Sequence, residues 1–83
     1  LVNKVVEPEA LMETVLQMAE TILTSAPIAV KYAKKCINDN YDMNREDSIR
    51  LENDYFAKCF ATSDQKEGMA AFLGKRKATF KNE

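Results

Sequence analysis

The sequence predicts an all-α protein, a small bundle of about four helices preceded by a short strand remnant. Three observations lead to this prediction. Apolar residues recur three and four positions apart through most of the chain, which is the spacing of one helix face. The two prolines and two glycines fall at or near the ends of these periodic segments, with the exception of Gly68. Only the first six residues show the alternation of a β-strand.

The opening hexapeptide LVNKVV, residues 1–6, predicts a strand without a partner. Its odd and even positions would face opposite sides of a sheet. A lone strand exposes a row of unpaired backbone donors and acceptors, and no other segment of the chain has strand character. We therefore interpret residues 1–6 as a piece of a larger sheet.

Prolines mark the start of the first two predicted helices. Pro8 suits a first helical position, and the acidic residues Glu7 and Glu9 favour the positive end of the helix dipole. Pro27, in the segment TSAP, ends this helix and begins the next one, which runs to the turn residues NDNYD. The first helix carries two adjacent apolar stripes, a face wider than one packing neighbour requires. These stripes are Leu11, Val15, Met18 and Ile22, and Met12, Leu16, Ala19 and Leu23.

Capping residues mark the other two predicted helices. Asn44 is a good N-cap for the third helix, and Asp47 strengthens this start. The segment TSDQ, residues 62–65, matches a capping box for the fourth helix. Thr62 would be the cap with Gln65 reaching back, although Ser63 fits a cap equally well. We expect Gly74 to close the fourth helix in the left-handed conformation.

The composition excludes several classes of protein. Eighty-three residues make at most one domain, and 12 basic against 13 acidic residues give a net charge of −1, which argues against a nucleic-acid partner. No apolar run approaches the roughly 20 residues of a membrane span. Cys36 and Cys59 lack the spacing and the histidines of a zinc site, and two lone thiols fit a reducing compartment. We expect buried, unpaired thiols in a soluble cytoplasmic domain that carries no secretory leader.

No catalytic site is predicted within this chain, and no metal site. It has no histidine, so nucleophilic Ser–His and Cys–His pairs are excluded. Its carboxylates could be imagined as a general acid and base, but they are flanked by opposite charge, and acid–base work needs a pKa raised by burial. We interpret them as a solvated helix face: Glu46, Asp47, Glu52 and Asp54.

Two features stay open at this point. Phe56 and Phe60 stand one helical turn apart and fit a core face, although an aromatic ligand contact has the same pattern. The basic run Lys75 to Lys77, extended by Lys81, could complement the helix dipole and keep the tail soluble. It could also attract an anionic ligand.

Three segments resemble the C-terminal third of the enoyl-CoA hydratase, or crotonase, superfamily. They are LVNKVVEPEAL, APIAVKYAKKCIN and FATSDQKEGMAAFLGKRKATF, and the resemblance extends in the same order over essentially the whole chain. The last segment is the most specific, because it combines a cap, an acidic–glycine pair, an Ala–Phe pair and a basic run. Within the superfamily the sequence looks like the short-chain bacterial crotonases, the 3-hydroxybutyryl-CoA dehydratases of fatty acid and butyrate metabolism.

The resemblance implies the C-terminal helical region of a crotonase-type fold. Residues 1–6 would then be the remnant of the last strand of an N-terminal spiral domain, and residues 7–83 a helical oligomerisation and CoA-lid region. The parent would be a hydro-lyase that reversibly dehydrates 3-hydroxyacyl-CoA, forming trimers or dimers of trimers, with a coenzyme A thioester as substrate and no other cofactor. Its two catalytic glutamates belong to the spiral, so this piece alone should be inactive and should form a dimer or higher oligomer.

The resemblance also implies two CoA-binding residues. Phe56 matches an aromatic position near the adenine, and Lys75 matches a lysine near the nucleotide end, with Arg76 and Lys77 adding attraction. Gly74 departs from the glutamate that the family places before this basic run. Two alternatives need no parent enzyme: a free-standing helical acyl-CoA-binding module, whose family tryptophan is absent here, and a self-association module without a ligand.

Overall fold

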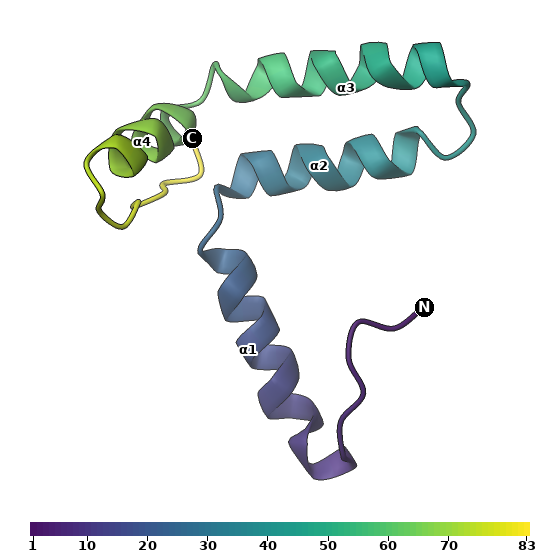
Figure 1. Ribbon diagram of the computed structural model, residues 1–83, viewed down its shortest axis with the longest axis vertical. Helices are drawn as coiled ribbons and strands as arrows, with labels where there is room; N and C mark the ends of the chain where they lie inside the picture. The colour runs from purple at the N-terminus through teal and green to yellow at the C-terminus, as the bar shows by residue number, and fades with distance from the viewer.

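The computed structural model describes all 83 residues, and it is helical throughout with no strand (Figure 1). The all-α prediction with four α-helices is therefore confirmed. A short 3-10 helix, Pro8–Ala10, leads directly into the first α-helix. The α-helices are α1 (Leu11–Leu23), α2 (Pro27–Asp39), α3 (Arg45–Cys59) and α4 (Ser63–Leu73). None of these helices has the length and apolar character needed to cross a membrane.

Residues 1–6 belong to neither a helix nor a strand in this structure. A strand is defined by its hydrogen bonds to a neighbour, and this chain offers no second extended segment to supply them. The interpretation of residues 1–6 as the last strand of a larger sheet stays a prediction about a longer protein.

The predicted helix starts are confirmed, and each has a local cause. Pro27 occupies the first turn of α2, and Ala26 before it is extended (φ −61°, ψ 117°), as a residue preceding proline prefers. The Asn44 side chain accepts a hydrogen bond from the Asp47 N–H at 3.0 Å. The Thr62 hydroxyl accepts from the Gln65 N–H at 3.1 Å, which identifies Thr62 rather than Ser63 as the cap of α4.

The prediction for the end of α4 is wrong by one residue. Gly74 remains right-handed (φ −79°, ψ 0°), whereas Lys75 takes the left-handed conformation with φ 49°. The Arg76 N–H donates to the Ala71 carbonyl at 3.0 Å and the Lys75 N–H donates to the Phe72 carbonyl at 3.2 Å. This pair of bonds is a Schellman motif with lysine at the position that glycine usually fills. Arg76 and Thr79 both contact Glu67 on α4, and these contacts hold the left-handed turn at Lys75 rather than at Gly74.

Helix-to-helix packing is concentrated between α2 and α3, which lie antiparallel and side by side (Figure 1). Tyr55 on α3 is buried between them and stacks on Tyr32 of α2, with ring centroids 5.4 Å apart. Its hydroxyl donates to Asp39 at 2.9 Å, and Asp39 also accepts from Lys35 at 2.9 Å. The Lys35 ammonium, followed by the Tyr55 hydroxyl, holds the pKa of Asp39 below its ordinary value.

The chain does not enclose a core of its own. Only Tyr55, Asp64 and Ala71 are buried, and α1 projects away from the α2–α3 pair with its wide apolar face uncovered (Figure 1). The radius of gyration is 16.0 Å, whereas a compact chain of this length would have about 12 Å. The accessible surface is 7230 Å², against about 5000 Å² for a compact monomer of this mass. Cys36 and Cys59 are unpaired as expected, but they are half-buried rather than buried.

We expect the substitution Thr62→Ala to lower the free energy of unfolding by about 1 kcal/mol, because the Gln65 N–H loses its acceptor at the start of α4. Urea denaturation measures this change. Thr62→Ser keeps the hydroxyl and serves as the matched control, with a free energy close to that of the unsubstituted protein. Equal losses in the two variants would show that the hydroxyl does not carry the contribution.

Candidate functional site

Phe56 presents an open aromatic face on α3. Its side chain is 65% exposed, and its ring meets the ring of Phe60 edge-to-face at a centroid distance of 5.2 Å. The core interpretation of Phe56 therefore does not hold within this chain, where nothing covers the ring. A flat, exposed ring of this kind can stack on another aromatic surface.

A groove between α2 and α3 begins beside this ring. Its volume is about 570 Å³, and eight of its ten lining residues are apolar, among them Phe56, Tyr32 and both cysteines. At one end the Asn40 amide nitrogen donates to the sulfur of Cys36 at 3.4 Å, while the Asn40 carbonyl oxygen is buried without a partner. The groove contains no cluster of carboxylates or thiols able to bind a metal ion.

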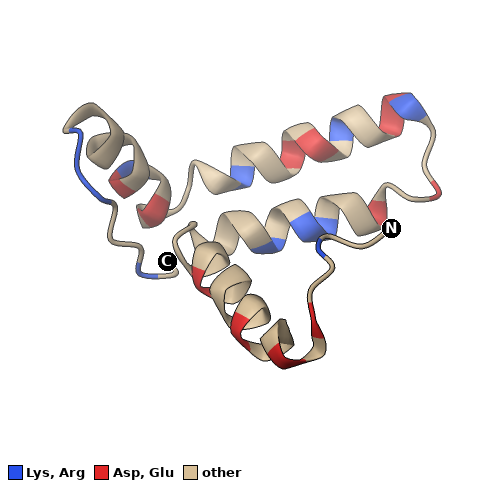
Figure 2. Cartoon of the chain, turned by 60° about the horizontal axis from the view of Figure 1, so that its bottom comes forward, with Lys and Arg blue, Asp and Glu red and all other residues tan.

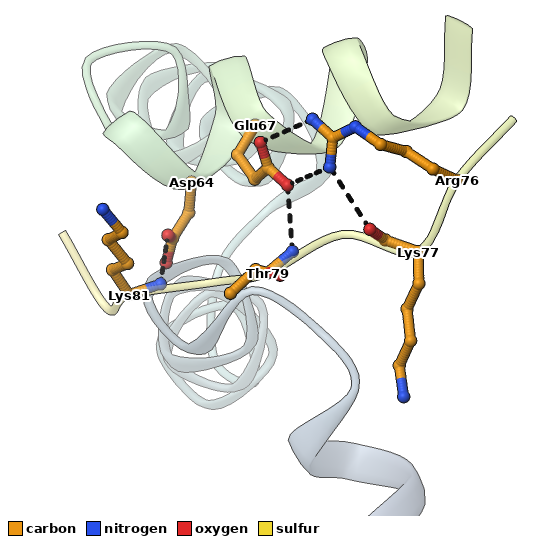
Figure 3. A network of polar contacts seen from close by, with 6 residues as sticks. All are labelled: Asp64, Glu67, Arg76, Lys77, Thr79 and Lys81. Atoms are coloured by element: carbon orange, nitrogen blue, oxygen red, sulfur yellow. Dashed lines mark hydrogen bonds and ion pairs between the residues drawn. The ribbon is translucent and has the colours of Figure 1, made fainter. Parts of the chain in front are cut away.

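The C-terminal tail, residues 75–83, folds back along α4 (Figure 1). Glu67 receives two parallel hydrogen bonds from the Arg76 guanidinium, Nη1 to Oε1 at 2.6 Å and Nη2 to Oε2 at 2.9 Å. The N–H of Thr79 donates to the same Oε1 at 2.9 Å (Figure 3). One carboxylate therefore fixes both the side chain of Arg76 and the backbone three residues further along the tail.

A second carboxylate, one turn earlier on α4, holds the end of the tail. Asp64 is 2% exposed and accepts a hydrogen bond from the Lys81 N–H at 2.7 Å (Figure 3). It also accepts one from the Asn82 N–H at 2.9 Å. Its own N–H donates to the Glu83 carbonyl at 2.9 Å. The Phe80 ring lies over Gly68, where a β-carbon would stand 3.5 Å from it. Gly68, the one glycine inside a helix, therefore lies where the tail crosses α4 closely.

The electrostatics of this contact are dominated by the ion pair. The Arg76 guanidinium, followed by the Thr79 N–H, lowers the pKa of Glu67 to about 2 from an ordinary 4.5. The same pair raises the pKa of Arg76. Both groups are therefore charged at every physiological pH.

Within the basic run, one cation is paired with a carboxylate and two are not. Arg76 pairs with Glu67, whereas Lys75 and Lys77 are exposed and form no ion pair within this chain. Figure 2 shows these basic residues gathered after α4, while the charged residues of α1 are acidic. Because Lys75 is left-handed, its side chain leaves the helix end in a direction that a right-handed residue would not take.

The two predicted CoA-binding residues lie on different elements, Phe56 on α3 and Lys75 after α4. Their role in binding CoA stays a prediction. Sequence reasoning missed the importance of Asp64 and Glu67, which it treated only as the polar start of a helix. A signal was present, because two acidic residues one turn apart precede a basic run.

Known proteins resemble this chain over its whole length. The family model described as enoyl-CoA hydratase/isomerase matches residues 1–83. The short-chain-enoyl-CoA hydratase of Clostridium acetobutylicum is 46% identical over 83 residues, which cover 99% of this chain and 32% of that protein. The crotonyl-CoA hydratase of Syntrophomonas wolfei is 48% identical over 80 residues, which cover 96% of this chain and 31% of that one.

Solved structures that resemble this chain are also enoyl-CoA hydratases. A crystal structure of an enoyl-CoA hydratase from Bacillus anthracis superimposes with a TM-score of 0.89 and 31% identity, and the match covers 94% of this chain and 30% of that one. The chain thus spans about a third of the length of the relatives that it matches.

We expect the contact between the tail and α4 to weaken only in strong acid. Because the folded pKa of Glu67 lies below its ordinary value, its stabilising contribution is complete above pH 4.5 and is lost as the pH falls through about 2. The NMR shift of the Thr79 amide, which donates to Glu67, reports this transition. Its midpoint should lie near pH 2, and the transition should be missing in Glu67→Gln. A midpoint near 4.5 would contradict the ion pair.

Proposed function

Because the chain belongs to the enoyl-CoA hydratase/isomerase family, we propose that it is the C-terminal helical part of a short-chain enoyl-CoA hydratase. The complete protein would reversibly add water to crotonyl-CoA, which is the dehydration of 3-hydroxybutyryl-CoA in reverse. The Clostridium relative is a short-chain-enoyl-CoA hydratase and the Syntrophomonas relative a crotonyl-CoA hydratase, which supports this choice of reaction and of a short acyl chain.

One observation carries the proposal that the catalytic groups lie outside this chain. A general acid needs a carboxyl group whose pKa is raised by burial. The two carboxylates with a shifted pKa, Asp39 and Glu67, are both shifted downward by a neighbouring cation. The carboxylates of the α3 face are exposed, and Glu46 among them pairs with Arg50 at 2.6 Å. Asp64 is buried, but both of its oxygens accept backbone N–H groups of the tail. Neither Asp39 nor Glu67 therefore has the raised pKa that a general acid needs.

The chain would therefore contribute binding rather than chemistry. The exposed ring of Phe56 would stack on the adenine of coenzyme A, and the unpaired ammonium of Lys75 would meet a phosphate at the nucleotide end. Binding energy from the nucleotide part of CoA can lower the activation barrier of hydration at the acyl end, because it holds the thioester where the catalytic groups act.

The uncovered apolar faces would be the surfaces through which this region meets the rest of the protein and its neighbouring subunits. Exposed apolar patches of this extent are typical of interaction sites, and a homo-oligomer such as a trimer or a dimer of trimers would cover them. Such contacts would bring the exposed Phe56 and Lys75 against CoA held mainly by another part of the assembly.

The complete protein is expected to consume crotonyl-CoA, followed as the loss of absorbance of the conjugated thioester, whereas the isolated 83-residue chain should show no turnover. Activity of the isolated chain would contradict the absence of catalytic groups. Coenzyme A binding by a monomeric 83-residue chain would instead favour a free-standing acyl-CoA-binding module.

The isolated chain is also expected to self-associate, because its apolar surface has no cover within the 83 residues. Light scattering over a range of concentrations should give masses above the 9.4 kDa of a single chain. A constant monomer mass at the highest concentrations would contradict this expectation.

A further inference from the structure

We propose that Glu67 is a positioning residue for the substrate: by clamping Arg76 it holds the left-handed turn that aims the Lys75 ammonium at the anionic nucleotide end of acyl-CoA. This inference rests on the proposed function above and assigns a role to a residue that does not itself contact the ligand.

The turn after α4 has to be held, since lysine does not favour it. A residue with a β-carbon in the left-handed region costs about 1 kcal/mol relative to its right-handed conformation. Lys75 nevertheless has φ 49°, although a glycine stands immediately before it. Without an external restraint, the helix would more readily end with Gly74 in the left-handed position. The direction of the Lys75 side chain would then change, because the turn would shift by one residue.

Glu67 supplies that restraint through the residue that follows Lys75. The guanidinium of Arg76 is fixed by both carboxylate oxygens of Glu67, and its Nη1 also donates to the Lys77 carbonyl at 3.2 Å (Figure 3). The Arg76 N–H closes the turn on Ala71. Both the backbone and the side chain of Arg76 are thus bound to α4. Lys75 lies between the end of α4 on one side and the fixed Arg76 on the other.

The charge of Glu67 allows a positioning role to be distinguished from attraction by net charge. Glu67 neutralises Arg76, so it removes one positive charge from a surface that would bind an anion. If attraction alone mattered, neutralising Glu67 would release Arg76 and strengthen the binding of acyl-CoA. If Glu67 positions Lys75, its neutralisation weakens the binding. The two views predict changes of opposite sign.

The experiment measures kcat and KM of the complete protein with two substrates. Crotonyl-CoA carries the nucleotide, whereas crotonyl-pantetheine ends before it and cannot reach Lys75. Glu67→Gln is expected to raise KM for crotonyl-CoA about fivefold to tenfold, with kcat nearly unchanged and with no effect on crotonyl-pantetheine. The unchanged reaction with the shorter thioester also shows that the variant is folded.

Three further variants make the test specific. Lys75→Asn removes the ammonium but keeps a residue that tolerates the left-handed conformation, and it should raise KM for crotonyl-CoA to a similar extent. The double variant should be no worse than Lys75→Asn alone, because Glu67 acts through Lys75. Arg76→Lys conserves the net charge and loses the two-pronged pairing, so it should also raise KM. Glu46→Gln, which breaks an exposed ion pair of α3, is the matched control without an effect.

Each alternative result overturns a defined statement. A lower or unchanged KM in Glu67→Gln, in a protein whose Lys75→Asn variant shows a raised KM, overturns the positioning role alone. Additive losses in the double variant do the same, as does an equal loss with crotonyl-pantetheine. An unchanged KM in Lys75→Asn overturns the role of Lys75 and the inference with it. A complete protein that hydrates neither substrate overturns the proposed function itself.

Discussion

Tyr55 is the only aromatic residue that the chain buries, and the packing of α3 against α2 depends on the contacts that Tyr55 makes. It stacks on Tyr32, donates to Asp39, and lies 5.0 Å from the Lys58 ammonium on its own helix. Burial, followed by the nearby Asp39 carboxylate, raises the pKa of its phenol, so the hydroxyl stays a donor at neutral pH. The contact fixes α3 against α2, and the groove beside Phe56 exists because these two helices are held in this way.

Beyond that pair, the shape of the chain is determined by its helix ends rather than by a core. Pro27 begins α2 through its own backbone preference, and Asn44 and Thr62 cap α3 and α4 by accepting from the N–H three residues later. Such local interactions do not require a hydrophobic interior, which explains how an elongated chain with a radius of gyration of 16.0 Å keeps defined helices. The apolar faces of those helices are consequently free to serve contacts outside these 83 residues.

This difference between local and distant interactions also explains what the sequence could predict. Helix starts at Pro8, Pro27, Asn44 and Thr62 follow from residues next to them and are confirmed. The end of α4 was predicted wrongly, because Arg76 and Thr79 meet Glu67 across nine and twelve residues, and these contacts outweigh the preference for Gly74. For the candidate site, periodicity left Phe56 and the basic run open, and only the family resemblance assigned them a ligand.

The ion pair between Glu67 and Arg76 neutralises one cation of the basic run and fixes the backbone beside the others. A small basic segment can gain selectivity in this way. Three adjacent cations on a mobile tail would attract any polyanion, and that attraction would fall steeply with salt. Pairing Arg76 with Glu67 reduces the attraction, but it fixes the backbone on the C-terminal side of Lys75. A phosphate contact made by a fixed ammonium loses less conformational freedom than one made by a loose tail. In the proposed role, a chain with a net charge of −1 would offer the Lys75 ammonium to a nucleotide through geometry, without the basic excess of a general anion binder.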